Sequence, residues 1–246
     1  MSPSTIPHSP RIGTAGWTIP APVRDRFPAE GAGLQRYARV FDGVEINSTF
    51  YRSHRPGTLA RWAETTPEDF RFAVKLPKAI THDARLAEPA ARLAAFRADT
   101  APLGDKLGPW LIQLPPSLAF ESAEAEQFFA LLRTVWAGPA ACEPRHPTWF
   151  EPFADDLLRS YRVGRVAADP LRHPAAANPG GWPGLAYWRL HGSPRMYYSA
   201  YEPAYLSALQ ERMAAGEALE TWCIFDNTTL GAATANALSL QHAIHS

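Results

Sequence analysis

Polar residues of the types used in acid/base chemistry and anion binding stand just past short apolar runs at several places in the sequence. These residues are Glu45, Gln113, Glu143, Asp169, Arg189 and Asn227. Short apolar or β-branched runs are typical of buried parallel strands, and polar groups at the carboxyl ends of such strands mark the active-site end of an α/β barrel. The sequence therefore predicts where a site lies, although it does not specify a reaction.

The segment Cys142–Phe150 holds the densest group of chemically capable side chains. It contains Glu143, Arg145, His146 and Trp149. A carboxylate and an imidazole can exchange protons with a substrate, a guanidinium binds anions, and an indole offers a stacking surface. The alternative is a structural ion-pair corner covered by aromatic residues. We predict that Glu143 and His146 carry proton transfer, with Glu45 on the other side of the substrate. Burial raises the pKa of Glu143 and Arg145 lowers it, so the net direction stays open.

Glu45 and Asn47 introduce polar groups on one side of an extended segment, because side chains alternate along a strand. An unpaired carboxylate is costly to bury, so Glu45 needs a compensating group if it faces the interior. Lys75 ends the apolar run that begins at Phe72. We interpret Lys75 either as the counter-ion of this carboxylate or as a clamp for a substrate.

Arg189 and His191 alternate with apolar Leu190 and are expected to share a face. A lone loop histidine such as His82 is more often structural than a ligand, although its neighbours favour a functional role. We predict that Lys75, Arg145 and Arg189 form an anion subsite, because ammonium and guanidinium groups in a partly dry cleft favour phosphate, sulfate or carboxylate. The predicted substrate-binding residues are Asn47, Tyr51, Lys75, His82, Gln113, Arg145, Trp149, Asp169, Arg189, His191 and Asn227.

Composition narrows the classes of partner. The 246 residues include 24 Lys and Arg and 24 Asp and Glu, so no overall field attracts nucleic acid or an anionic membrane. Cys142 and Cys223 lie in separate apolar runs and are expected to be buried thiols. Residues 1–10 are rich in Ser and Pro, lack the apolar core of a signal peptide and are expected to be a disordered tail. We therefore expect a cytoplasmic protein with no membrane partner.

The elements that must position these side chains alternate between strand and helix. The predicted strands are Arg11–Gly13, Gly43–Ile46, Arg71–Leu76, Trp110–Leu114, Ala140–Cys142, Val166–Ala168, Leu185–Leu190 and Thr221–Phe225. The predicted helices are Leu34–Val40, Thr58–Thr65, Glu88–Ala101, Ser122–Val135, Phe153–Tyr161, Glu202–Ala215 and Ala232–Ile244. This alternation predicts parallel strands with right-handed crossovers. Eight such units favour a closed TIM-like (β/α) barrel formed by residues 11–246 as one domain. The alternative, without the first strand, is an open doubly wound sheet. Residues 173–184 are predicted to be a long loop.

Taken in order, the motifs resemble the YecE-like family, the domain of unknown function numbered seventy-two. They are Gly13–Trp17, Val44–Arg52, Phe72–Pro77, Ile80–His82, Ile112–Ser117, Glu143–Phe150, Arg189–Gly192 and Phe225–Thr228. The similarity extends from Arg11 to Ala243 and implies a TIM-like barrel without an established activity. Pro144 stands where the family usually has an aromatic residue, and Thr18–Pro20 lacks the aromatic pair that commonly follows Gly-Trp.

Three functions remain compatible with the sequence. The first is an enzyme of the hydrolase or lyase type that applies acid/base chemistry to a polar, anionic small molecule. The second is a metal-dependent phosphodiesterase or nuclease with ligands among Glu45, His82, Glu143, His146, Asp169 and His191. We favour the first and predict no cofactor and no tightly held metal, because cations intervene and the chain has no compact metal-ligand motif. The third is a ligand-binding module without catalysis. The sequence does not indicate an oligomeric state.

Overall fold

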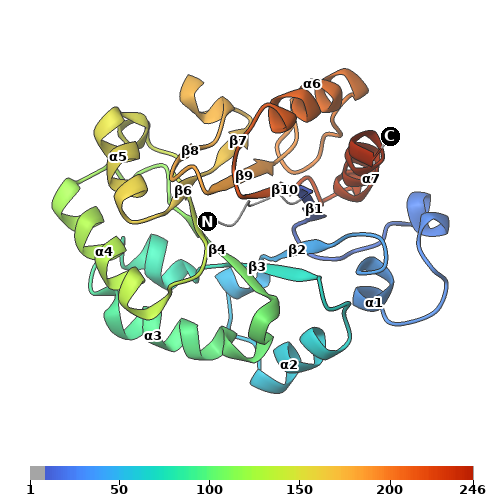
Figure 1. The fold of residues 1–246 in the computed structure, drawn as a ribbon, viewed down its shortest axis with the longest axis horizontal. Coiled ribbons are helices and arrows are strands. Elements are labelled where there is room, and N and C mark those ends of the chain that lie inside the picture. The colour runs from blue at the N-terminus through green and yellow to red at the C-terminus, as the bar shows by residue number, and fades with distance from the viewer. Residues whose placement is uncertain (1–8, 246) are drawn as a thin grey trace, which may run out of the picture.

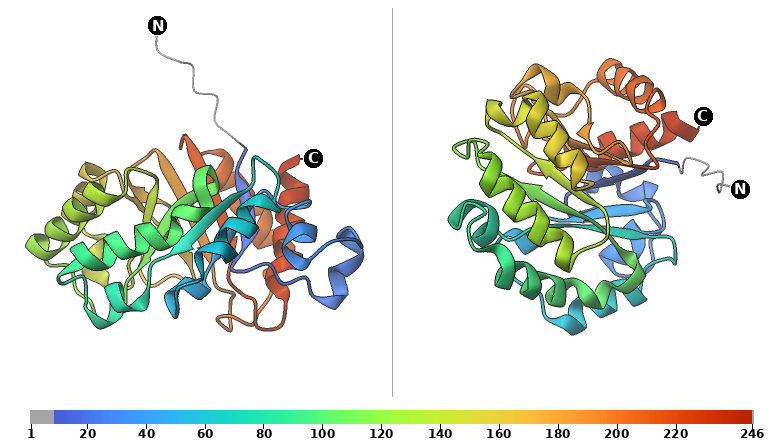
Figure 2. Two further views of the ribbon diagram at one scale, coloured as in Figure 1. Left: turned by 90° about the horizontal axis from the view of Figure 1, so that it is seen from below. Right: turned by 60° about the vertical axis from the view of Figure 1, so that its left-hand side comes forward.

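Strands occupy the centre of the fold and helices surround them (Figure 1), as drawn in a computed structural model that describes residues 9–245. The strands are β1 Arg11–Thr14, β2 Gly43–Ile46, β3 Arg71–Lys75, β4 Leu107–Gln113, β5 Ala140–Glu143, β6 Gly164–Arg165, β7 Ala167–Asp169, β8 Gly180–Gly181, β9 Leu185–Leu190 and β10 Glu220–Phe225. The main helices are α1 Gly33–Tyr37, α2 Pro56–Glu64, α3 Pro89–Thr100, α4 Ser122–Val135, α5 Pro152–Ser160, α6 Pro203–Ala214 and α7 Ala232–His245. Helices α3 to α5, green to yellow, lie outside the strands in both views of Figure 2. Most of the predicted tail, residues 1–10, lies outside the described residues.

The strands form two sheets, with the orders β1-β10-β9-β7 and β2-β3-β4-β5-β6-β8. Every neighbouring pair is parallel except β6 and β8, which are antiparallel. An isolated parallel bridge between Ala15 and Glu45 joins the sheets on one side, and Val166 separates β6 from β7 on the other. The mixed α/β fold with parallel strands is therefore confirmed. The strand ladders do not close into one barrel, so the closed barrel stays a prediction.

Two predicted segments differ from the structure. The predicted strand Val166–Ala168 is divided into β6 and β7, which pair with β5 and β9 respectively and so belong to different sheets. The predicted loop over residues 173–184 contains a short 3-10 helix, Pro174–Ala177, and the two-residue strand β8 at the edge of the larger sheet. Each of these elements has only two to four residues and lacks the longer apolar run that identifies a buried strand in sequence.

Side chains alternate between two apolar layers along the strands, as the period of a strand requires. One layer lies between the sheets and the helices and includes Phe72, Val74, Trp188 and Leu190. The other joins residues of both sheets: Ala73, Leu111, Ala141, Val166, Leu185, Tyr187, Trp222 and Ile224. The two sheets therefore enclose a shared apolar interior.

A polar layer follows the shared interior at the carboxyl ends of the strands. Two residues beyond Ala73, Leu111, Ala141, Tyr187 and Ile224 stand Lys75, Gln113, Glu143, Arg189 and Asp226. Because a step of two residues keeps the same face of a strand, these side chains continue the interior as a buried polar layer. Each of these five residues is at most 7% exposed. The fold thus places polar groups from five strands, four of them charged, at one end of its core.

Cys142 and Cys223 are free and buried, as expected, and burial raises the pKa of each thiol. Within residues 9–245, no helix combines the length and apolarity needed to cross a membrane.

Candidate functional site

Arg189 lies at the centre of the polar layer and is shared by three carboxylates. Its Nη2 lies 2.8 Å from Glu45 Oε1 and 2.9 Å from Asp226 Oδ2, and its Nη1 lies 3.1 Å from Glu143 Oε2. Burial opposes its charge, but attraction to Asp226, Glu45 and Glu143 outweighs burial and raises the pKa of Arg189 well above its ordinary value. Its Nε also donates to Glu45, at 3.0 Å, so all three guanidinium nitrogens are engaged. Arg189 therefore has no free edge for the predicted anion subsite.

Glu45 is compensated by Arg189 and a tyrosine rather than by Lys75. The Tyr187 hydroxyl donates to Glu45 Oε2 at 2.9 Å, and both side chains are fully buried. Burial, and then the charge of Glu45, raise the pKa of Tyr187 well above its ordinary value. Tyr187 is therefore a fixed donor that holds the carboxylate in place, and Lys75 is left for another role.

His191 bridges two of the carboxylates. Its Nε2 lies 3.1 Å from Glu143 Oε1 and its Nδ1 lies 3.1 Å from Asp226 Oδ2. Burial disfavours the imidazolium, but the charge of Glu143 and the hydrogen bonds to both carboxylates outweigh it and raise the pKa of His191. When His191 is protonated, each ring N–H donates to one carboxylate, which completes an alternating chain of positive and negative groups around Arg189.

Glu143 is held as a carboxylate. Burial alone raises a carboxyl pKa, but the charges of Arg189 and His191, a hydrogen bond from His191 and the charge of Arg145 lower the pKa of Glu143 well below its ordinary value. The direction that sequence left open is therefore downward. A carboxylate with three cationic partners is a poor proton donor and a weak base, so this geometry does not support Glu143 as the main proton carrier.

His146 is not brought to Glu143. Its Nδ1 lies 2.9 Å from the Thr148 hydroxyl and accepts a hydrogen bond from the Thr148 amide at 3.4 Å. The imidazole thereby caps the short 3-10 helix Pro147–Phe150. Among the described residues, no hydrogen bond or ion pair joins His146 to Glu143. The imidazole partner of Glu143 is His191, which the chain supplies from the end of β9.

Lys75 ends β3 with its amine uncommitted. The side chain is 6% exposed, and Nζ lies 4.2 Å from the centre of the Phe50 ring. No group within residues 9–245 accepts a hydrogen bond from this amine or forms an ion pair with it. Burial, and then the charge of Arg189, lower the pKa of Lys75 to about 8, because Glu45, Glu143 and Asp226 offset these effects only in part. Lys75 is therefore partly neutral close to physiological pH.

His82 and Arg145 lie on the same side of the site as Lys75. The His82 ring contacts Phe50 edge to face, with centroids 4.9 Å apart, and its Nδ1 lies 2.8 Å from the Thr81 hydroxyl. Burial, and then the charges of Lys75 and Arg145, lower the pKa of His82. Arg145 Nη2 lies 3.1 Å from Glu143 Oε1, and its side chain is 12% exposed. The positive charges of Lys75 and Arg145 both act on the His82 ring, and such a positive field favours the binding of an anion.

The charges of the cluster favour the same conclusion. The cations Arg145, Arg189 and protonated His191 balance the carboxylates of Glu45, Glu143 and Asp226. Protonated Lys75 therefore adds one positive charge in excess. A bound anion would neutralise this excess and would return Lys75 toward its charged form.

Two asparagines at the strand ends differ in their surroundings. Asn47 Oδ1 is buried without a hydrogen-bond partner, and its Nδ2 lies 3.5 Å from Asp226 Oδ1. The Asn227 amide instead donates to the Ser199 carbonyl at 2.8 Å and to Asn236 Oδ1 at 3.0 Å, which fixes the loop after β9 to α7. The Asn227 Oδ1 is also buried without a partner, but two hydrogen bonds fix its amide, so Asn227 has a structural role. We assign the acceptor for a ligand to Asn47, whose amide makes only one long contact.

The remaining predicted residues are distributed as follows. Gln113 belongs to the polar layer, with Oε1 3.5 Å from Arg189 Nη1, and Asp169 accepts a hydrogen bond from Tyr201 at 2.8 Å. Tyr51 is 80% exposed at the rim. Trp149 is 1% exposed and donates its indole N–H to the Leu118 carbonyl at 3.0 Å. Trp149 therefore belongs to the hydrophobic core, where apolar side chains cover its faces, and is not available as the predicted stacking surface.

Asp226 and Tyr187 were missing from the predicted site. Both follow the strand period, since Tyr187, Arg189 and His191 share one face of β9 and Asp226 stands two residues beyond Ile224. That alternation can be seen in the sequence. Sequence alone does not show, however, that this face of β9 contacts Glu45 and Glu143 from the other sheet.

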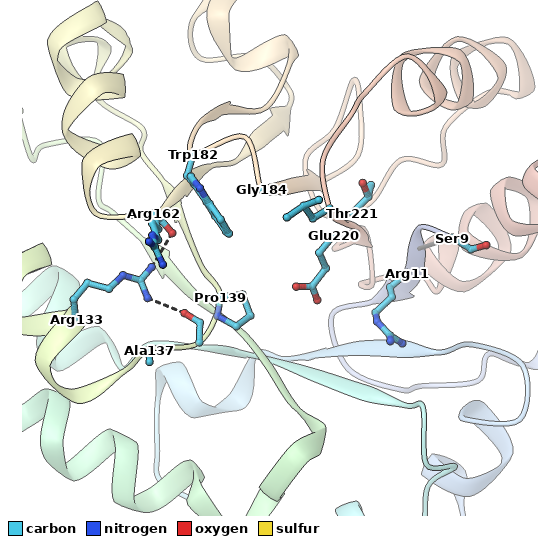
Figure 3. A pocket seen from close by; sticks show the side chains of 12 residues that line it. Ser9, Arg11, Arg133, Ala137, Pro139, Arg162, Trp182, Gly184, Glu220 and Thr221 are labelled. Carbon is cyan, nitrogen blue, oxygen red and sulfur yellow. Dashed lines mark hydrogen bonds between the residues drawn. The ribbon is translucent and has the colours of Figure 1, made fainter. Parts of the chain in front are cut away.

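The cavity at the polar layer is much smaller than a pocket at the other end of the strands. At the polar layer, a small cavity of about 10 Å³ is bordered by Glu143, Arg145 and His191. A larger pocket of about 480 Å³ lies at the opposite, amino-terminal end of the strands (Figure 3). Arg133 in that pocket donates to the carbonyls of Gly138 and Arg162, at 2.7 and 2.8 Å, and is thus structurally engaged (Figure 3). We place the candidate site at the polar layer, because buried groups with shifted pKa values cluster there.

Within residues 9–245, no group of three or more His, Cys, Asp or Glu side chains is arranged to hold a metal ion. Whether the purified protein carries a metal stays a prediction.

Comparison with known proteins shows which family the chain resembles. The family model described as "Protein of unknown function DUF72" matches residues 11–246. The Escherichia coli K12 "UPF0759 protein YecE" is 36% identical over 143 residues, which are 56% of this chain and 49% of YecE. The Bacillus subtilis "UPF0759 protein YunF" is 27% identical over 147 residues, 57% of this chain and 52% of YunF. The chain thus matches about half the length of these curated relatives.

Solved structures share the fold over nearly the whole chain. A crystal structure of a DUF72 family protein from Thermotoga maritima has a TM-score of 0.81 and 25% identity, covering 97% of this chain and 100% of that chain. A DUF72 family protein from Enterococcus faecalis also has a TM-score of 0.81, with 22% identity over 97% of this chain and 96% of that chain. The second likeness concerns the fold alone.

Proposed function

The chain belongs to the DUF72 family, whose description states no function, and from its site we propose an enzyme that applies acid/base chemistry to a small anionic molecule. The site lies at the carboxyl ends of the strands, and we propose that the two sheets act together there as the mouth of a TIM-like barrel. The observation that carries this proposal is that the buried Lys75 amine, beside a charge-balanced network of ion pairs, forms no hydrogen bond or ion pair within residues 9–245.

Anion binding is supported by the three basic groups on one side of the site. Burial, and then the positive charges of Lys75 and Arg145, lower the pKa of His82, so a positive field acts at the His82 ring. Arg189, in contrast, is occupied by three carboxylates. We therefore assign the anion to Lys75, His82 and Arg145, and give Arg189 the task of holding the network in position.

Proton transfer is best supported at Lys75. A general base is most effective when its pKa lies near the working pH, and the pKa of Lys75 is about 8. Glu143 is held as a carboxylate by its cationic partners, and His146 caps a helix. We therefore propose Lys75 as the proton carrier and Glu45, Glu143 and Asp226 as fixed charges that stabilise positive charge on a reacting group.

The direct test is calorimetric titration of inorganic phosphate into the wild-type protein and into Lys75→Met and Arg145→Met variants. Each substitution removes one cation from the subsite, so we expect at least about a tenfold loss of affinity from each, as for a charge-assisted hydrogen bond. Arg159→Met, which removes an exposed cation on α5, serves as the matched control and is expected to leave the affinity unchanged.

The pH dependence gives a second readout. Phosphate affinity is expected to fall as pH rises through about 8, because neutral Lys75 no longer attracts the anion. Equal affinity in wild type, Lys75→Met and Arg145→Met would contradict the proposed subsite. Binding that behaves as expected, but without turnover of any compound in a panel of anionic metabolites, would favour a ligand-binding module over an enzyme.

A further inference from the structure

Lys75 differs from the other lysines of the chain in having no partner for its amine. The sequence contains three lysines, Lys75, Lys78 and Lys106. Lys78 Nζ lies 3.4 Å from Asp83 Oδ1 on the exposed surface. Lys106 Nζ donates to the carbonyls of Ala63 and Thr66. All three residues are described by the structure, and only the Lys75 amine makes neither a hydrogen bond nor an ion pair within residues 9–245.

The surroundings of the Lys75 amine resemble those that make an amine a nucleophile. It lies over the Phe50 ring, and burial together with the charge of Arg189 favours the neutral form, which has a free electron pair. On the adjacent strand, Ile46 is opposite Val74, so Asn47 follows β2 beside Lys75. The buried Oδ1 of Asn47 lacks a partner and can accept a hydrogen bond from a hydroxyl of a bound molecule.

We propose that Lys75 forms an imine with the carbonyl carbon of a small aldehyde or ketone that also carries a carboxylate or phosphate group. This inference rests on the proposed function, since Arg145 and His82 hold the anionic group while the carbonyl lies against Lys75. It adds the substrate class and a covalent step to the same site.

The step balances without an additional reagent. The neutral amine attacks the carbonyl carbon, the carbonyl oxygen gains a proton and the nitrogen loses one, which gives a carbinolamine. The hydroxyl then takes up a proton and leaves as water, and a protonated C=N bond remains. Three carboxylates, Glu45, Glu143 and Asp226, raise the pKa of Lys75 through their charges and so favour a cation at its nitrogen. The same field stabilises the positively charged imine.

Reductive trapping tests this inference on the full chain. The protein is incubated with glyoxylate, an aldehyde that carries a carboxylate, and with sodium cyanoborohydride, which reduces an imine to a stable carboxymethyl-lysine. Mass spectrometry then locates the adduct, with Lys78 and Lys106 as internal controls. Acetaldehyde serves as the neutral probe, and Lys75→Met and Arg145→Met are treated in parallel.

We expect Lys75 to react faster than Lys78 by on the order of tenfold near pH 8. About half of an amine with a pKa near 8 is neutral at that pH, compared with under about 1% at the ordinary value near 10.4; poorer access to a buried amine offsets part of this advantage. Glyoxylate is expected to modify Lys75 faster than acetaldehyde does, and Arg145→Met is expected to remove that preference.

The outcomes separate this inference from the proposed function. Adducts that form at Lys78 and Lys106 as fast as at Lys75 overturn the imine, even where phosphate titration supports the anion subsite. Selective reaction of Lys75 with both aldehydes at equal rates supports the nucleophile but overturns the anionic substrate class, and with it the proposed subsite. Selective reaction of Lys75 with glyoxylate, which is lost in the Lys75→Met variant, supports both the imine and the anion subsite.

Discussion

Replacement of Arg189 by methionine is expected to destabilise the fold more than any other single loss of charge in the site. The arginine forms ion pairs of 2.8, 2.9 and 3.1 Å with three carboxylates whose side chains are at most 8% exposed. Breaking one buried pair by removing a partner costs about 3–5 kcal/mol, because the other charge stays buried without compensation. Here one substitution leaves three carboxylates whose remaining partners are His191, Arg145 and the Tyr187 hydroxyl.

We therefore expect a loss of about 5 kcal/mol, which approaches the whole unfolding free energy of a marginally stable domain. For a protein of this size, each kcal/mol shifts Tm by about 2–4 °C, so the expected shift is about 10–20 °C. Calorimetry or circular dichroism on heating measures it. Arg159→Met is the control, since it removes an exposed pair with Asp156 and is expected to cost less than about 1 kcal/mol.

The cause of the loss can be checked by pH. If uncompensated carboxylates destabilise Arg189→Met, the deficit should shrink as pH falls and these groups take up protons. A variant within about 1 kcal/mol of wild type, or a deficit that does not change with pH, would refute the view that Arg189 holds the network together.

Further predictions concern single groups of the site. Lys75→Met is expected to be more stable than wild type at pH 7, by about 3 kcal/mol at most. Burial lowers the lysine pKa from 10.5 to about 8, and each pKa unit corresponds to about 1.4 kcal/mol. Urea denaturation at several pH values should show that this gain disappears above the ordinary lysine pKa. His191 has a raised pKa, so its stabilising contribution is fully present below its unfolded pKa of about 6.5 and is lost as pH rises through the folded value. The difference between wild type and His191→Gln should therefore be larger at pH 6 than at pH 9. Asn236→Ala removes hydrogen bonds to Tyr201 and Asn227 and should lower the unfolding free energy by about 1–3 kcal/mol. Protein purified without added metal is expected to contain less than one equivalent of zinc, manganese or iron by mass spectrometry of the elements, and a stoichiometric metal would favour the nuclease alternative.

The strand positions followed from sequence because apolar runs and their ends are local signals. Gly43–Ile46 and Leu185–Leu190 were predicted with the bounds that the structure has. Glu45, Lys75, Glu143 and Arg189 were predicted to face one site from the same signals. Lys75, Glu143 and Arg189 lie in the polar layer, and Glu45 is paired with Arg189 of that layer. The division of the sixth strand into β6 and β7 was not predictable in this way, because two- and three-residue strands are defined by their partners in the sheets.

Partner choice within the site depends on contacts that are distant in sequence. His146 is three residues from Glu143, yet the imidazole that pairs with Glu143 belongs to His191, 48 positions along the chain. Trp149 has the residue type of a stacking surface, but the helix Pro147–Phe150 turns it into the core. Sequence suggested Lys75 as the counter-ion of Glu45, but the structure pairs Glu45 with Arg189, because β9 meets β2 across the interior.

The position of a bound anion tests most directly whether the functional site lies at the polar layer. Crystals of the protein soaked in phosphate are expected to show density within hydrogen-bond distance of Lys75 Nζ and of Arg145 or His82, with Arg189 still paired to its three carboxylates. Phosphate bound only in the amino-terminal pocket of Figure 3, near Arg11 or Arg162, with the polar layer empty, would contradict the assignment of the functional site.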